Sequence, residues 1–345
     1  MGRRLLRAND ILIETAGGSR ERPTGRSVLV SQDVLDAFPG DVTCASFARF
    51  LRVDPDVASP RFIYWYLQHL YARGDMWMHQ VQHTGVARFQ FTRFSQTHKV
   101  QLPVRAEQEA VADVLGVLDD KIAVNERIAV TADELALALA LDERWEKRIR
   151  LGEIADLSKV QQVPQELSDD LVDHYSLPAF DSRKAPDRCS PLSIKSGKFV
   201  IDSPAVLLSK LNPEIPRAWD VVPDGSVPSL ASTEFLVLVP GLGISTHELW
   251  SVVAQRKFLE ELAAKVTGTS KSHQRVRPAE VMETEVVDPR QFGEVGGQIR
   301  SLAQSILAAR RESKTLATLR DTLLPQLMSG RLRVKDAEKI VEDHV

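Results

Sequence analysis

Two segments of this chain carry closely spaced basic and amide side chains directly after a Thr-Gly pair, Thr84-Gly85 and Thr267-Gly268. The side chains are Arg88, Gln90 and Arg93 in the first segment, and Lys271, His273, Gln274, Arg275 and Arg277 in the second. Arginine and glutamine can form paired hydrogen bonds with guanine and adenine, and lysine can bind phosphate. The residue types therefore favour contact with DNA bases, against the plain alternative that exposed loops are polar anyway.

A third basic loop lies near the start of the chain, at residues 17–26, which are rich in glycine and arginine. Arg20, Arg22 and Arg26 are its candidate DNA contacts. No counterpart of this loop is evident in the second half of the sequence, so its support is weaker.

The two Thr-Gly segments belong to a longer repeated pattern. Each leads through a basic stretch to a proline, Pro103 or Pro289, and then to a long series of apolar residues at helical spacing. The two Thr-Gly pairs lie 183 positions apart. A repeat of this size predicts two similar modules that do the same work at two places.

Composition limits the possible partners. The 345 residues leave room for about two domains, and 43% of them are apolar. The net charge of −3 means that any DNA binding must come from local basic patches or be shared with partner subunits. Cys44 and Cys189 suggest no disulfide framework, and no apolar run is long enough for a signal peptide or membrane span. We expect a cytoplasmic protein without a membrane partner.

Residues 1–103 are predicted to form the first mixed module. Strands are expected at residues 10–13 and 47–53, and Ser59-Pro60 is expected to cap and open a helix.

Residues 151–290 are predicted to form the second module, with strands at 198–201, 205–208 and 234–239. The Ser245 to Glu248 segment reads as a capping box. Aligning Leu12 with Leu208 leaves roughly 45 residues of the second module without a counterpart before Leu12. We therefore expect the first module to be incomplete at its N-terminus.

Two long helices are expected after the modules, within residues 104–150 and 291–330. The first should run to about residue 146, a length of roughly 65 Å. Its apolar seam is Val111, Val114, Leu118, Lys121, Asn125, Ile128, Ala132, Leu135 and Leu139. The second seam is Val295, Ile299, Leu302, Ile306, Ala309, Ser313, Leu316, Arg320, Leu323 and Leu327. Seams of similar length favour an antiparallel coiled-coil pair.

The predicted fold class is thus mixed α/β (α+β), with two modules separated by two long antiparallel helices. Gly330 should cap the second helix, and Pro325 should distort its last turn. The charged tail at residues 331–345 is expected to be mobile. Lys121 and Asn125 interrupt the first seam, where they would set the register, contact another subunit, or mark a seam open to solvent.

No catalytic constellation emerges from the sequence. It contains no phosphate-binding glycine loop, no Asn-Pro-Pro-aromatic run, and no cysteine beside His79, His83 and His98 that would suggest a metal site. We expect these histidines to be surface or packing residues and the chain to hold no cofactor or metal of its own.

Three phrases resemble the specificity subunit of type I restriction-modification systems. The first is Leu102-Pro103 with Glu107-Gln108, followed by residues 114–122 and Asn125. The others are Ser232 to Phe235 and the C-terminal run from Leu319 to Pro325 that ends at Ser329-Gly330. The resemblance covers nearly the whole chain and its domain order, and it departs at the N-terminus.

The resemblance implies that two target recognition domains each read half of a bipartite DNA sequence. The paired helices would hold them apart and dock two methyltransferase subunits, with Lys121, Asn125 and Arg320 as candidate interface residues. Restriction subunits would then join, so that S-adenosylmethionine, Mg and ATP act on partner subunits. Rival interpretations are a helical scaffold that binds no DNA, and an enzyme that acts by itself.

Overall fold

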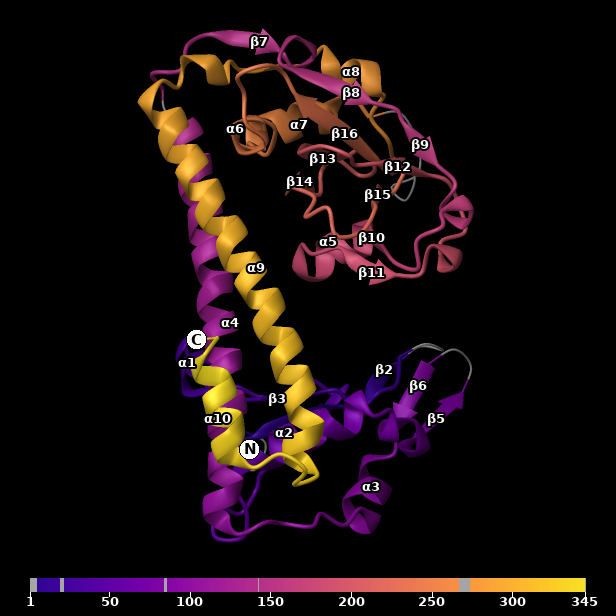
Figure 1. The fold of residues 1–345 in the computed structure, drawn as a ribbon, viewed down its shortest axis with the longest axis vertical. Coiled ribbons are helices and arrows are strands. Elements are labelled where there is room, and N and C mark those ends of the chain that lie inside the picture. The colour runs from indigo at the N-terminus through magenta and orange to yellow at the C-terminus, as the bar shows by residue number, and fades with distance from the viewer. Residues whose placement is uncertain (1–4, 19–21, 84–85, 142, 267–273, 345) are drawn as a thin grey trace. The chain divides into compact units, whose positions relative to one another are not determined.

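A computed structural model describes residues 5–18, 22–83, 86–141, 143–266 and 274–344. The chain divides into two compact units (Figure 1). The first unit comprises residues 1–126 and 310–345, and the second comprises residues 127–309. Each long helix, α4 (Arg105–Ala140) or α9 (Glu294–Met328), begins in one unit and ends in the other.

The described residues of the first unit form two small sheets, ordered β3-β1-β4 and β2-β6-β5, and helix α2 packs on the first of them. Its shorter elements are β1 (Ile11–Glu14), β2 (Ala16–Gly18), β3 (Ser27–Leu29), α1 (Gln32–Asp36), β4 (Ala48–Leu51), α2 (Pro60–Ala72), β5 (Gln80–His83), β6 (Val86–Phe89), α3 (Phe91–Thr97) and α10 (Val334–Glu342). The strands predicted at residues 10–13 and 47–53 are confirmed as β1 and β4. Ser59 precedes α2 as predicted, but its side chain makes no capping bond, and its amide donates to Gln108 Oε1 at 2.9 Å instead.

The second unit holds a four-stranded sheet, β14-β13-β16-β8, a five-stranded sheet, β11-β10-β15-β12-β9, and the pair β17-β7. Its strands are β7 (Arg148–Arg150), β8 (Ala155–Ser158), β9 (Gln161–Gln162), β10 (Val172–Tyr175), β11 (Asp187–Cys189), β12 (Lys198–Val200), β13 (Ala205–Ser209), β14 (Ala218–Val221), β15 (Ser229–Ala231), β16 (Phe235–Pro240) and β17 (Glu285–Val287). Its short helices are α5 (Leu177–Arg183), α6 (Thr246–Val253), α7 (Arg256–Ala264) and α8 (Pro278–Met282). The capping box before α6 is confirmed, with Glu248 N donating to Ser245 Oγ at 3.2 Å and Ser245 N to Glu248 Oε2 at 2.8 Å.

The two units repeat one arrangement of three strands and a helix. In the first unit β1 lies between β3 and β4, antiparallel to both, and α2 follows. In the second unit β13 lies between β14 and β16, again antiparallel to both, and α6 follows. The internal duplication expected from the sequence is therefore present in the fold.

The alignment of Leu12 with Leu208 is wrong by one residue. Ile11 and Ile13 face α2 in the core of the first unit, whereas Val206 and Leu208 share a buried cluster with α6 in the second. Leu12 lies on the other face of its sheet, so its counterpart is Leu207. A shift of one residue along a strand moves each side chain to the opposite face of the sheet, so the predicted alignment matched a residue of the outer face with one of the inner face.

The five-stranded sheet distinguishes the second unit. Four of its strands come from residues 161–200, a segment that precedes the repeated strands. Among the described residues of the first unit, no sheet corresponds to it. The extra length noted in the second module is therefore this sheet.

In the first unit the long helices pack antiparallel, as expected from their seams. Leu115 and Leu118 of α4 share a fully buried cluster with Leu316 and Leu323 of α9. Each buried Leu of this kind typically contributes about 2–5 kcal/mol relative to alanine.

In the second unit the seam of α4 departs from the prediction. Ile128 and Leu135 are exposed, and the alanine one position later, Ala129 or Ala136, is buried instead. Ala132, a predicted seam residue, is buried as expected, and Ala140 is buried in place of Leu139, so that these four alanines form a stripe. The stripe advances close to 3.6 residues per turn, as in a straight α-helix, and so drifts away from a strict heptad. The helix also ends at Ala140, earlier than the predicted residue 146.

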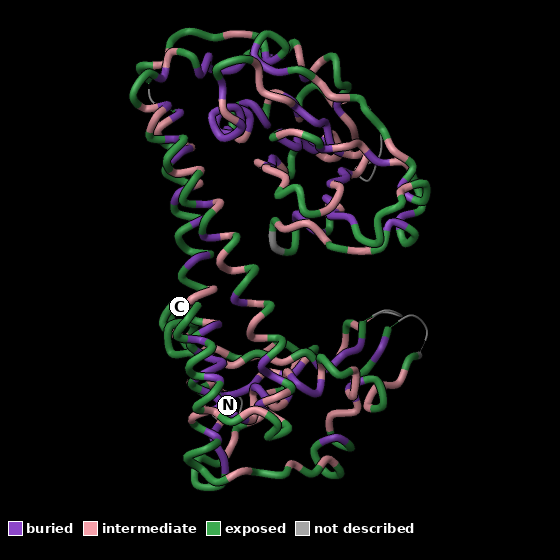
Figure 2. Tube along the Cα trace, in the orientation of Figure 1, coloured by how far each residue is buried: buried purple, intermediate pink, exposed green. Residues whose placement is uncertain are grey.

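The C-terminal tail is helical, contrary to the expectation that it is mobile. Gly330 has φ of +69°, which suits the predicted cap, and α9 continues through Pro325 to Met328. Helix α10 then buries Ala337 and Val341 in the same cluster as the long helices of the first unit. Figure 2 shows how buried, half-buried and exposed stretches follow one another along the chain.

Candidate nucleic-acid interface

The basic segments that follow the two Thr-Gly pairs occupy equivalent places in the two units. Phe89 N donates to Thr15 O at 3.0 Å in the first unit, and Val276 N donates to Lys210 O at 3.1 Å in the second. Each acceptor directly follows the central strand of its sheet. The residue before each donor is an arginine, so Arg88 and Arg275 are structural counterparts.

Backbone pairing fixes both arginines. Arg88 lies in β6 opposite Ala16 and Val81, and Arg275 forms an isolated bridge with Leu211. The Thr-Gly pairs themselves lie outside the described residues.

The two guanidinium groups differ in what they contact. Arg88 is exposed, and in the part of the chain that the structure describes no carboxylate pairs with it. Arg275 donates from Nη2 and Nε to the carboxylate of Glu234, at 2.8 and 3.1 Å. This bond raises the pKa of Arg275 and lowers the pKa of Glu234. A free planar fork can bind a guanine edge, whereas a fork held by a carboxylate must first release it.

One position of the repeat explains why Arg275 pairs with a carboxylate and Arg88 does not among the described residues. Thr15 N donates to Phe47 O, and Lys210 N donates to Glu234 O, so Phe47 stands where the second unit has Glu234. Phe47 carries no charge and is 67% exposed. The sequence alone did not indicate Glu234 as the partner of Arg275, because the two residues lie 41 positions apart.

The residues two positions after Arg88 and Arg275 are also equivalent in the two units. Gln90 precedes α3 and Arg277 precedes α8, each at the N-cap position of its helix. Arg277 and Arg93, on α3, are exposed, while Gln90 and Gln274 are half-buried. Arg88, Gln90 and Arg93 therefore come from one strand and the helix that follows it.

The remaining basic candidates are engaged within the protein or lie outside the described residues. Arg26 pairs with Glu14 through Nε and Nη2 at 3.1 and 2.9 Å, and Arg22 donates to Gly17 O at 2.9 Å. Arg20, Lys271 and His273 fall outside the described residues. Contrary to the sequence reading, Arg26 has a counterpart, because Glu14 N to Arg26 O and Ser209 N to Arg217 O are equivalent bonds.

An aromatic cluster packs around Phe94 of α3. The ring of Phe94 lies 4.9 Å from the rings of both His79 and His98, and Tyr66 Oη lies 2.9 Å from His98 Nε2. Burial lowers the pKa of both histidines, and Arg93 lowers that of His79 further. These two histidines therefore act as neutral packing residues beneath Arg93.

The polar positions of the helix seam are satisfied within the first unit. Glu312 of α9 accepts from Asn125 Nδ2 at 2.7 Å and lies 3.5 Å from Lys121 Nζ. Arg320 pairs with Asp119 of α4. Asn125 is only 3% exposed, so the seam is closed there, and a polar residue at such a place fixes the register.

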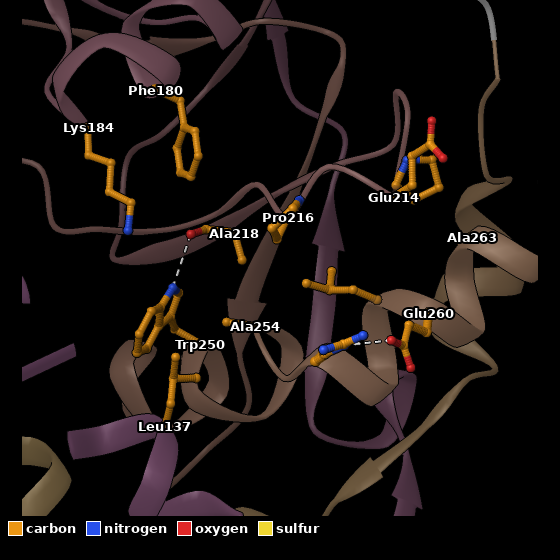
Figure 3. Close-up of a pocket in the computed structure, with 13 residues that line it drawn as sticks. Leu137, Phe180, Lys184, Glu214, Pro216, Ala218, Trp250, Ala254, Glu260 and Ala263 are labelled. Atoms are coloured by element: carbon orange, nitrogen blue, oxygen red, sulfur yellow. Dashed lines mark hydrogen bonds and ion pairs between the residues drawn. The ribbon is translucent and has the colours of Figure 1, made fainter. Parts of the chain in front are cut away.

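A pocket of about 610 Å³ lies in the second unit (Figure 3). Phe180, Trp250 and Leu137 line its apolar part, and the Trp250 ring donates to Ala218 O at 3.0 Å. None of the described residues that line it is a predicted DNA contact. The described residues also contain no group of three potential metal ligands and no helix suited to crossing a membrane.

Comparison with known proteins links this arrangement to one family of folds. No protein-family model matches the chain, and no curated protein matches it by sequence. Among solved structures, the S subunit of a type I restriction-modification system from M. genitalium has 16% identity and a TM-score of 0.50, over 95% of this chain and 84% of that one.

Two further structures cover 95% of this chain at 14% identity. The HsdS subunit from Thermoanaerobacter tengcongensis has a TM-score of 0.31 over 82% of its length. A chain from a study of complex assembly and conformational transition in the type I R-M system has 0.34 over 83%. On the strength of the M. genitalium structure, this chain has the fold of a type I restriction-modification S subunit.

Proposed function

We propose that this protein is the DNA sequence-recognition subunit of a type I restriction-modification complex. In this role each unit reads one half of a bipartite DNA target. The protein itself performs no catalysis, and S-adenosylmethionine, Mg and ATP are bound by the methyltransferase and restriction subunits that join it.

The observation that carries the proposal is the repeated placement of Arg88 and Arg275. Both lie on a short backbone pairing that follows the central strand, and two positions after each of them stands the N-cap residue of a short helix. Two equivalent arginine sites in one chain suit two half-sites better than a single substrate. The S-subunit fold supports the same conclusion.

An exposed apolar stripe on α4 supports a role in assembly. Val117 and Val124 in the first unit are 45% and 39% exposed, and Ile128 and Leu135 in the second are 44% and 48% exposed. In each unit the two residues are seven positions apart, so they lie on one face of that unit's part of α4, away from its buried seam. We propose that this exposed apolar face, in each unit by itself, contacts a methyltransferase subunit.

The test is a gel-shift assay on the chain assembled with its methyltransferase subunits. At low salt the complex should retain duplex DNA, and retention should fall steeply as salt rises, because phosphate contacts release counterions. A complex that forms but retains no DNA would refute the DNA-reading role and favour the scaffold interpretation. S-adenosylmethionine binding by the chain alone would favour an enzyme.

The docking face has its own test. Val124→Glu and Ile128→Glu place charges on the stripe, and Glu126→Gln is a matched control on the same helix. The Glu variants should lose the methyltransferase subunits in size-exclusion chromatography while the control keeps them. Unchanged assembly of the Glu variants would exclude this face.

A further inference from the structure

The outer face of the sheet β3-β1-β4 in the first unit carries a row of apolar side chains. Leu12 pairs with Val28 on one side and with Phe50 on the other, so the three side chains share one face. This face is opposite to the one that packs on α2. Val28 is 53% exposed, and Phe47 beside the row is 67% exposed.

The equivalent row in the second unit is closed. Leu207 pairs with Trp219 and Val237, and these side chains are 0%, 3% and 1% exposed. The rings of Tyr175 and Phe180 cover the row, with centroids 4.9 and 5.6 Å from that of Trp219. One sheet face is thus sealed by aromatic side chains in one unit and open in the other.

A charge accompanies the apolar row in both units. Arg217 donates from Nε and Nη2 to Asp181, each at 2.7 Å, and Asp181 directly follows Phe180. Its counterpart Arg26 is 51% exposed and pairs with Glu14, which stands where the second unit has the uncharged Ser209. In the second unit the covering segment therefore supplies both the aromatic rings and the carboxylate.

The open face also has the shape of a shallow groove. A hollow of about 490 Å³ brings together Leu12, Val28 and Phe47 with Arg26 and Glu14. Apolar surface of this kind beside a cation is typical of a binding site for another protein.

We propose that this groove is the docking site for a segment of a protein partner with the chemistry of residues 172–183 of this chain. That chemistry is an aromatic residue on an extended stretch, a second aromatic on a short helix, and a carboxylate directly after it. Arg26, on leaving Glu14, selects the carboxylate by charge complementarity, and the row around Leu12 selects the aromatics. Exchange with a second copy is disfavoured, because β10 lies between β11 and β15 in its own sheet.

The test uses a fluorescein-labelled peptide of residues 170–186 added to the full chain and measured by fluorescence anisotropy. Saturable binding is expected. It should be lost when Phe180→Ala is made in the peptide, and also when Val28→Arg is made in the chain. Asp181→Asn in the peptide should weaken binding about two- to fivefold, as expected for an exposed ion pair.

Matched variants separate this result from nonspecific binding. Glu14→Ser copies the second unit and frees Arg26, so it should increase the affinity for the peptide. Val28→Thr keeps the shape of the side chain and is the matched control for Val28→Arg. Circular dichroism shows whether each variant stays folded. No saturable binding up to about 1 mM, or binding that survives Val28→Arg, overturns the proposal. A dimer of the chain that Val28→Arg dissolves would assign the face to a second copy and also overturn it.

Discussion

Replacement of the two equivalent arginines by alanine should weaken DNA binding unequally. The Arg88 fork has no carboxylate partner among the described residues, so Arg88→Ala should remove a full base contact. Such a contact discriminates by about 1–3 kcal/mol, which is about 5- to 150-fold in affinity. The Arg275 fork must first leave Glu234, with which it makes a half-exposed ion pair. That pair stabilises the free protein by up to about 1 kcal/mol, so Arg275→Ala should cost correspondingly less.

The assay is equilibrium anisotropy on the assembled complex with its bipartite target and with duplexes in which one half-site is scrambled. Arg88→Lys keeps the charge but not the planar fork, so it should lose specificity while it keeps most nonspecific affinity. Glu234→Gln should release Arg275 and increase its contribution. Equal binding by wild-type, Arg88→Ala and Arg88→Lys proteins would refute the assignment. So would a loss that is the same on target and scrambled DNA, because that is the signature of a phosphate contact.

Three further predictions concern stability. Burial opposes ionisation of Asp288, yet hydrogen bonds from Arg290 and Lys147 lower its pKa from 3.8 to about 2. Asp288→Asn should therefore lower the free energy of unfolding by about 2 kcal/mol at pH 7, as measured by urea unfolding. The wild-type protein should lose this advantage as pH falls from about 4 to 2, and an equal loss in the variant would contradict the reasoning. His79 and His98 have lowered pKa values, so their neutral forms favour the folded state, and stability should fall as pH drops below 6.5. Amide hydrogen exchange in α3, corrected for intrinsic rates, should rise between pH 7.5 and 5.5, and constant protection would contradict this. Ala337→Asp places a charge in a fully buried site and should lower the melting temperature of the first unit, whereas a mobile tail would tolerate it.

Local signals in the sequence predicted the elements that depend on them. The capping box at Ser245 and Glu248 marks the start of α6, and the isolated apolar runs mark β1 and β16. The apolar series of α9 predicted the buried face of that helix, because large side chains alternate cleanly with polar ones.

Features set by distant contacts were not predictable in the same way. Leu207 and Leu208 are buried on opposite faces of one strand, so no alternation of apolar and polar residues reveals the register. Adjacent apolar residues in α4, such as Ile128 and Ala129, fit a heptad and a straight helix equally well. The ion pair between Arg275 and Glu234 forms only after the sheet does, so a sequence pattern of basic residues could not distinguish Arg275 from Arg88.

We propose that each unit reads one half of a bipartite DNA sequence. The most direct measurement is genome-wide mapping of methylated bases in cells that express this chain with its methyltransferase and restriction subunits. We expect a bipartite motif that depends on this chain, in which Arg88→Ala relaxes one half and leaves the other intact. A continuous motif, methylation that does not require the chain, or relaxation of both halves together would contradict it.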